Sequence, residues 1–174
     1  MASLTQTRTP PDLVTDCCTP FNPKPWDDVE LVWHDKPFVK EHVTSLFHVP
    51  LNMAAKLRHA NKLIEGSDEW ADGNILLCDE RSPWRSDLYV EVTGAVPGAE
   101  MVTLSGRFLT RVYDGPFRDA PHWVDDMKRH VAARGLSLLK LYFGYTTCPR
   151  CAKIYGHSYV VLFAQVEDAP TRRS

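Results

Sequence analysis

The stretch YFGYTTCPRCAKIYGHSYVVLF, residues 142–163, gathers side chains that could do chemistry. It holds four tyrosines, two phenylalanines and the pair Cys148-Pro-Arg-Cys151. Cysteines at this spacing bind zinc or exchange disulfides, whereas aromatic rings form flat apolar walls and tyrosine adds a hydroxyl that orients a ligand. The stretch therefore indicates either a metal or redox site or an aromatic binding surface.

The spacing of the other metal and redox donors favours the aromatic surface. A structural zinc ion takes four ligands, usually from two such pairs, and the nearest further donor here is His157, while Cys78 stands alone in a predicted strand. A thioredoxin-like pair opens a helix after a strand, whereas Cys148 and Cys151 fall in the connection of a predicted hairpin. We predict that they shape a loop over a ligand groove, with no metal and no cofactor. A metal- or thiol-dependent protein is the weakest of three hypotheses.

Acid–base groups for a hydrolytic reaction come from several parts of the chain. Glu80 ends an apolar strand and is the leading catalytic carboxylate, because burial beside aromatic rings raises a carboxyl pKa into a useful range. Tyr142 and Tyr145 are candidate proton donors to the substrate, and His48, at a strand-to-helix junction, is a candidate base or ligand contact. The sequence has no G-x-S-x-G nucleophile elbow and no phosphate-binding glycine loop, which argues against a covalent serine mechanism.

Aromatic side chains near these groups are the expected walls of the ligand site. Trp84 stands in a Pro-Trp loop with no place in a core by default, and Trp123 begins a predicted helix. Strand alternation places Phe143 with Tyr145 on one face and Tyr142 on the other. The candidate substrate-binding residues are Trp84, Trp123, Phe143, Phe163 and Tyr89.

The first half of the chain supplies a set of strands around one helix. Residues 29–34 and 38–49 are β-branched and aromatic, broken at Asp35-Lys36-Pro37, and are typical of strands. Residues 51–66 place apolar side chains at helical spacing and end on Gly66, the expected helix terminator. Residues 74–80 and 86–94 then predict two strands joined by a loop around Trp84.

The second half repeats this order. Residues 99–116 predict a strand bent at Gly106, and Asp119 and Pro121 mark the start of a helix whose Trp123 or Val124, Met127 and Val131 face inward. Gly135 ends that helix, and residues 136–147 and 158–166 form another strand pair. We therefore predict an α+β fold: duplicated β-α-β-β units forming one antiparallel sheet, with two helices on one face and a central ligand groove.

Composition limits the class of protein. The chain has 174 residues, 44 % of them apolar and 24 % charged, as expected for one globular domain. A net charge of −2 and a pI near 6.4 argue against direct nucleic-acid binding. No apolar run approaches the length of a membrane span, and the start MASLTQTRTPPDL lacks the apolar core of a signal peptide, so we expect neither; the five cysteines, an odd number, fit a reducing compartment. We expect a cytoplasmic monomer or homodimer.

The two ends of the chain differ from its centre. Residues 1–27 are rich in Pro, Thr and Asp and predict either an extended arm or a disordered tail. The adjacent cysteines there, Cys17 and Cys18, do not make a metal site on their own. The predicted organisation is an arm over residues 1–27, a folded domain over 28–168 and a tail over 169–174.

The order of elements over about residues 29–166 resembles the GyrI-like small-molecule-binding superfamily. The segments that carry this resemblance are LCDERSPWRSDLYVEV, residues 77–92, and LSGRFLTRVYDGPFRDAPHWVDDM, residues 104–127. The segment YTTCPRCAKIYGHSYVVLFA, residues 145–164, is similar to the hydrolase branch of that superfamily, the cyclopropanoid cyclopropyl and epoxide hydrolases.

The resemblance implies a cofactor-independent hydrolase that opens a strained three-membered ring, cyclopropane or epoxide, of a DNA-alkylating natural product held in an aromatic cage. Detoxification or self-resistance would be its purpose. Many GyrI-like binders carry a glutamate in the last strand for cationic drugs, whereas this chain has no acid there before Glu167. The expected ligand is therefore neutral, flat and aromatic. The alternative is a drug-binding protein that sequesters such a ligand without turnover.

Overall fold

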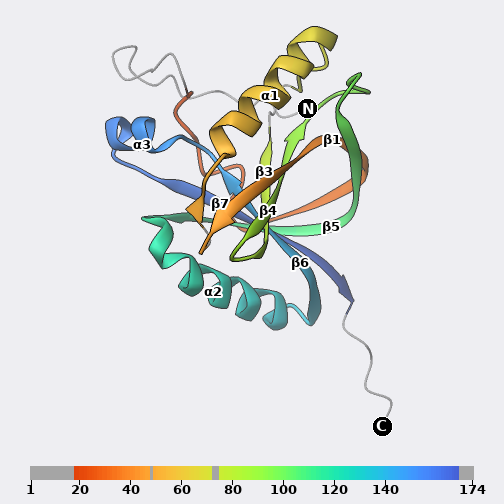
Figure 1. Ribbon diagram of the computed structural model, residues 1–174. Helices are drawn as coiled ribbons and strands as arrows, with labels where there is room; N and C mark the ends of the chain where they lie inside the picture. Colours follow the sequence, from red (N-terminus) through yellow and green to blue (C-terminus); the bar gives the residue numbers. More distant parts are fainter. Residues whose placement is uncertain (1–17, 48, 72–74, 169–174) are drawn as a thin grey trace.

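The computed structural model describes residues 18–47, 49–71 and 75–168, and Figure 1 shows their elements in two consecutive halves. The first half contains β1 (Val29–Leu46), β2 (Val49–Pro50), α1 (Met53–Ser67), β3 (Leu76–Ser82) and β4 (Arg85–Glu91). The second contains β5 (Glu100–Asp114), a 3-10 turn (Phe117–Asp119), α2 (Ala120–Ala133), β6 (Leu136–Tyr145), α3 (Pro149–Tyr155) and β7 (Tyr159–Asp168). The α+β class and the repeated β-α-β-β order are confirmed, with β2 and α3 as additions.

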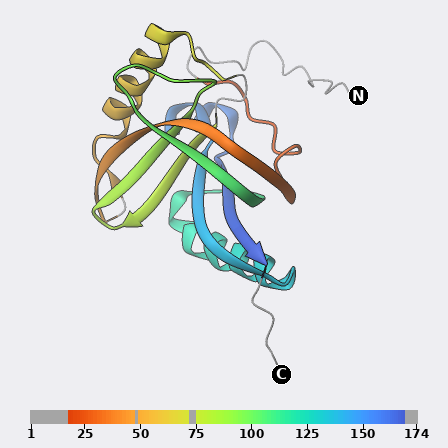
Figure 2. The same ribbon diagram turned by 90° about the vertical axis from the view of Figure 1, so that its right-hand side faces the viewer.

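The strands form one antiparallel sheet of order β2-β1-β4-β3-β6-β7-β5, in which β1 also pairs with β5. Because β1 has 18 residues, its first part pairs with β5 and its later part, Phe38–Thr44, pairs with β4. This double pairing closes the six longer strands around a common interior, and Figure 2 shows the strands curling round it. The single predicted sheet is thus a closed barrel.

The predicted break at Asp35-Lys36-Pro37 is wrong in one respect, because β1 runs through it. The β1–β5 register shifts between Trp33 and Lys36, which marks a bulge within one continuous strand. Asp35 takes a positive φ of 48° there, a conformation that aspartate tolerates better than most residues. The bulge therefore bends β1 where the sequence predicted an end.

Both long helices cover the outer face of the barrel. On α1, Ala60 and Ile64 are buried against Val39 and Val90. On α2, the buried residues are Ala120, Trp123, Met127 and Val131, which pack on β6 and β7. The predicted inward positions of α2 are therefore confirmed. The end of α1 differs from the prediction: Asp68, with φ of 58°, is the left-handed cap, and Gly66 lies inside the helix.

The inner face of the barrel holds an aromatic core. Its buried members are Trp33, Phe38, Leu77, Tyr89, Phe108, Tyr142, Val161 and Phe163. Phe21 and Trp26, from the irregular segment before β1, pack against this core. The Thr110 hydroxyl donates to the Trp26 carbonyl at 2.6 Å, which attaches the segment to β5.

The first 17 residues, with Cys17, lie outside the described residues, as do residues 169–174 of the predicted tail. Within the described residues, none of the helices has the length and hydropathy that crossing a membrane requires.

Candidate functional site

A cavity of about 570 Å³ lies at the junction of the two halves. The junction is the seam between β3 and β6, whose register pairs are Leu77↔Gly144 and Cys78↔Phe143. The cavity borders this short paired region, because Leu76 of β3 and Gly144 and Tyr145 of β6 belong to its lining. The cavity is lined by Cys18, Thr19, Phe21, Trp26, Leu57, Asn61, Ile75, Leu76, Val90, Gly144, Tyr145, Thr146, Val161 and Phe163.

The lining suits an uncharged aromatic ligand. None of the described lining residues is an acid, a lysine or an arginine. Trp26 and Phe163 meet edge to face with ring centroids 6.0 Å apart, and Phe21 adds a third ring. The amide of Asn61 and the hydroxyls of Tyr145 and Thr146 are the polar groups that could orient a ligand. The volume lies within the range of small-molecule sites, roughly 300–1,000 Å³.

The cavity residue that could take part in acid–base chemistry is Tyr145, the last residue of β6. Its hydroxyl donates to Glu80 Oε1 at 2.7 Å. Glu80 lies on β3, so this hydrogen bond joins the two halves of the chain across the seam. Burial raises the pKa of Tyr145 well above its usual value, and the neighbouring Glu80 charge adds to the shift. Tyr145 is therefore a neutral phenol at physiological pH and keeps the proton that it shares with the carboxylate.

The nearby thiol of Cys78 is not a suitable nucleophile. Burial, together with the charge of Glu80, raises the pKa of Cys78 to about 12. The thiolate is the reactive form of cysteine, and this side chain is fully buried in the core beneath α2. Glu80 and Tyr145 thus remain the predicted catalytic residues that the structure brings together at the cavity.

Tyr142 and Tyr89, two further predicted site residues, belong to the inner core instead of the cavity wall. Lys140 Nζ lies 4.7 Å from the ring centroid of Tyr142 and 2.8 Å from a carboxylate oxygen of Asp79. Burial raises the pKa of Tyr89 to about 12. This part of the interior is a packed network of rings and paired charges.

Other predicted residues lie apart from the cavity, with Phe163 as the exception. Trp123 and Phe143 are buried in the outer core, the apolar cluster between α2 and the outer face of the barrel. There Trp123 stacks on Tyr113, with ring centroids 5.6 Å apart. Trp84 is 52 % exposed at the β3–β4 turn, and its ring centroid lies 5.0 Å from that of Phe47. His48 lies outside the described residues.

Sequence reasoning missed the walls that come from the segment before β1 and from α1. Phe21 and Trp26 precede β1 and are far in sequence from the β6 and β7 residues of the same wall, and Leu57 and Asn61 belong to a helix that the sequence predicts only as a covering layer. Two aromatic residues within a Pro-rich segment were the available signal, because such a segment has no core of its own in which to bury them.

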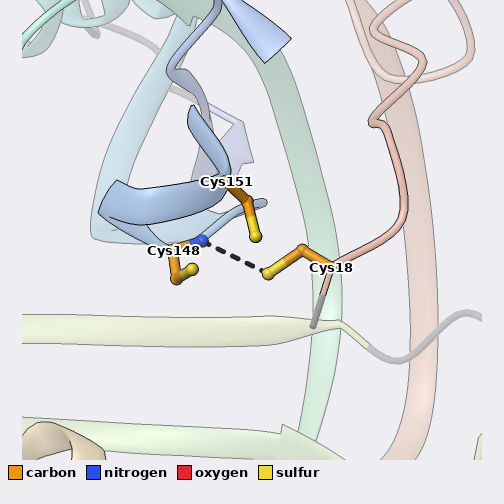
Figure 3. A group of neighbouring side chains, drawn as sticks. All are labelled: Cys18, Cys148 and Cys151. Atoms are coloured by element: carbon orange, nitrogen blue, oxygen red, sulfur yellow. Dashed lines mark hydrogen bonds between the residues drawn. The ribbon is translucent and has the colours of Figure 1, made fainter. Parts of the chain in front are cut away.

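The connection between β6 and β7 also differs from the prediction. It contains α3, and Cys148 is the N-cap residue of that helix with Cys151 in its first turn. The pair therefore does follow a strand and open a helix, a placement that the hairpin interpretation excluded. Cys18, from the segment before β1, lies beside both residues, as Figure 3 shows.

Comparisons with known proteins agree with a hydrolase assignment. The model of a family described as "Bacterial hydrolase" matches residues 9–166. Two solved structures from Listeria innocua share the fold. One, an uncharacterized conserved protein, has a TM-score of 0.60 at 12 % identity, and the other, a hydrolase, has 0.58 at 14 %. Each match covers 81 % of this chain and 92 % of the other. No curated protein matches.

Proposed function

The chain belongs to the bacterial hydrolase family, and we propose that it hydrolyses a strained three-membered ring, a cyclopropane or an epoxide, in a flat and uncharged DNA-alkylating natural product. One observation carries the proposal: the Tyr145–Glu80 hydrogen bond stands in the wall of an aromatic cavity whose described lining has no ionised side chain. Ring strain supplies much of the driving force, so the site needs to position water and move one proton.

Tyr145 and Glu80 can move that proton together. As a water oxygen bonds to a ring carbon, the water proton passes to Tyr145 Oη and the phenol proton passes to Glu80. The broken ring bond leaves its electron pair on the epoxide oxygen or, for a conjugated cyclopropane, on the carbonyl oxygen. The proton returns through Tyr145 to that oxygen. The net reaction adds one water molecule, and the protein ends in its starting state.

The cavity walls supply the binding energy in this scheme. Trp26, Phe163 and Phe21 offer ring surface to a flat ligand, and burial of apolar area is worth about 25 cal/mol per Å². An uncharged lining would leave the ionic centre of a cationic drug without a partner, which is why we propose a neutral ligand. In a cell, this reaction would detoxify the alkylator or protect its producer.

The proposal is tested by incubating the protein with a cyclopropane-bearing alkylator and, separately, with an epoxide-bearing one, in isotope-labelled water. Mass spectrometry should find a product heavier by one labelled water, in molar excess over protein. The Tyr113→Phe variant is a control that should retain this activity, because Tyr113 does not line the cavity. Unmodified alkylator at the buffer rate would reject the proposal. Stoichiometric protection without product would instead favour sequestration.

A further inference from the structure

Cys18, Cys148 and Cys151 form a cluster that the hydrolytic site does not use. Their three sulfur atoms all lie within 4.8 Å of one another. Cys148 and Cys151 come from the start of α3, whereas Cys18 precedes β1, so the cluster joins parts of the chain that are 130 residues apart. The sequence lacked a third donor for the Cys148–Cys151 pair, and the fold supplies one.

We propose that these three cysteines bind one Zn²⁺ ion. Zinc–thiolate bonds are about 2.3 Å long, so tetrahedral coordination places sulfur atoms roughly 3.8 Å apart. The observed separations reach this value by movements of less than about 1 Å, which side-chain rotation supplies. Three thiolates form a soft donor set that favours zinc over magnesium or calcium. The described residues supply three ligands, so a water molecule would complete the tetrahedron.

The backbone already holds the cluster in place. The N–H of Cys148 donates to Cys18 Sγ at 3.4 Å, as the dashed line in Figure 3 marks. The hydroxyl of Tyr155, at the other end of α3, donates to the Cys18 carbonyl. His157, the donor nearest to the pair in sequence, instead bonds Asp114 through Nδ1 at 2.6 Å.

A zinc ion here would attach the segment before β1 to α3. Cys18 also lines the cavity, and Phe21 and Trp26 follow it in the same wall. At its other end the segment is held by Thr110, whose hydroxyl bonds the Trp26 carbonyl. The metal would therefore fix the second end of a cavity wall and would take no part in the proton transfer proposed above.

The test uses the full-length protein, chelated under reducing conditions and then titrated with Zn²⁺ and with Co²⁺, without any substrate. We expect one ion per chain, and for Co²⁺ a thiolate charge-transfer band with the intense visible bands of tetrahedral coordination. Cys18→Ser should weaken binding at least tenfold and reduce the charge-transfer band. Cys78→Ala is the matched control that should bind normally, because Cys78 lies in the outer core.

Cys18→Ser is the decisive variant, because Cys18 is partly exposed whereas Cys151 is fully buried. Circular dichroism would verify that it folds. The proposal is overturned if the wild-type protein takes up no zinc, or if Cys18→Ser binds as tightly as wild type. Because metal uptake is measured without substrate, failure here leaves the hydrolytic proposal intact, and the reverse also holds.

Discussion

Two tyrosine–carboxylate pairs in this molecule have nearly the same geometry in different surroundings. Tyr145 donates to Glu80 at 2.7 Å, and Tyr113 donates to Asp126 at 2.9 Å. Tyr113 lies on β5 and Asp126 on α2, both in the second half of the chain. The first pair joins the two halves at the cavity, whereas the second fastens α2 to β5.

The surroundings give the second pair a structural function. Arg111 Nη1 lies 2.8 Å from Asp126 Oδ2, and Arg129 Nη2 lies 3.6 Å from Oδ1. The hydrogen bond from Tyr113 is the main cause that lowers the pKa of Asp126; burial opposes it, and the two arginines lower the pKa further. Burial, then the Asp126 contact, raises the pKa of Tyr113. The comparison shows that a phenol–carboxylate bond alone does not mark a site; the cavity beside it does.

The largest expected effect comes from removing the titratable group of the cavity pair. Glu80→Gln keeps the size of the side chain, and we expect turnover to fall about 10²–10⁴-fold, the usual range for general acid–base catalysis. Ligand affinity should change little, because the rings of the cavity are unaltered. Asp126→Asn, the matched change in the other pair, should keep turnover within about twofold. Steady-state kinetics at saturating substrate would measure both, and wild-type turnover in Glu80→Gln would contradict the assignment.

Removing the phenol oxygen should have different effects on turnover in the two pairs. Tyr145→Phe breaks the proposed proton path, so the rate should fall by a factor in the same range, about 10²–10⁴. Tyr113→Phe should leave the rate unchanged and lower only stability. The measurements are kcat for each variant and its unfolding in urea. Equal rates in the two variants would mean that the cavity confers no special function on its pair.

Narrowing the cavity should affect ligand binding beside the Tyr145–Glu80 pair and leave the Tyr113–Asp126 pair unchanged. An added Cβ at Gly144 would stand 2.7 Å from Phe163 Cε2 and 3.1 Å from the Val161 carbonyl oxygen. Gly144→Ala therefore has to displace Phe163, at an overpacking cost of about 1–3 kcal/mol, and should weaken ligand binding. Gly66→Ala is the control, because nothing lies within 4 Å of its Cβ position. Replacing that helical glycine should stabilise the protein by up to about 1 kcal/mol. Urea unfolding and ligand titration would check both variants, and full ligand affinity in Gly144→Ala would argue against this cavity as the binding site.

The smallest effect concerns acid stability. The pKa of Asp126 is lower in the folded protein than the ordinary pKa of an aspartate, so its contribution to stability is present above that ordinary pKa and is lost as the pH falls through the folded pKa. We expect Asp126→Asn to flatten the acid limb of the unfolding free energy below about pH 4, by less than about 1 kcal/mol for so exposed a pair. Urea unfolding between pH 2 and pH 7 would show it. An unchanged acid limb would mean that Tyr113 and the arginines do not hold this carboxylate in solution.

The sequence predicted the elements well because their signals are local. Alternation in β6 placed Tyr142 and Tyr145 on opposite faces, and helical spacing identified the buried side of α2. Contacts between distant segments carry no local signal. Closure of the barrel by β1 and β5, and the approach of Cys18 to Cys148, depend on packing between remote parts of the chain.

The site, too, could be predicted only where its residues have a local signal in the sequence. Glu80 was identified from its position at the end of an apolar strand, and Tyr145 from its place in an aromatic stretch. The loop position of Trp84 predicts a ligand contact, yet its ring pairs with Phe47 and does not line the cavity. Trp26 went unnoticed because nothing in the sequence says which surface an irregular segment covers.

The most direct test of the account is a crystal structure of Glu80→Gln bound to an unreacted cyclopropane- or epoxide-bearing alkylator. We expect the ligand between Trp26 and Phe163, with its ring oxygen or carbonyl oxygen about 2.6–3.2 Å from Tyr145 Oη, the reach of a proton transfer. A ligand bound at the exposed Trp84–Phe47 pair, with the cavity at the β3–β6 seam unfilled, would contradict the account.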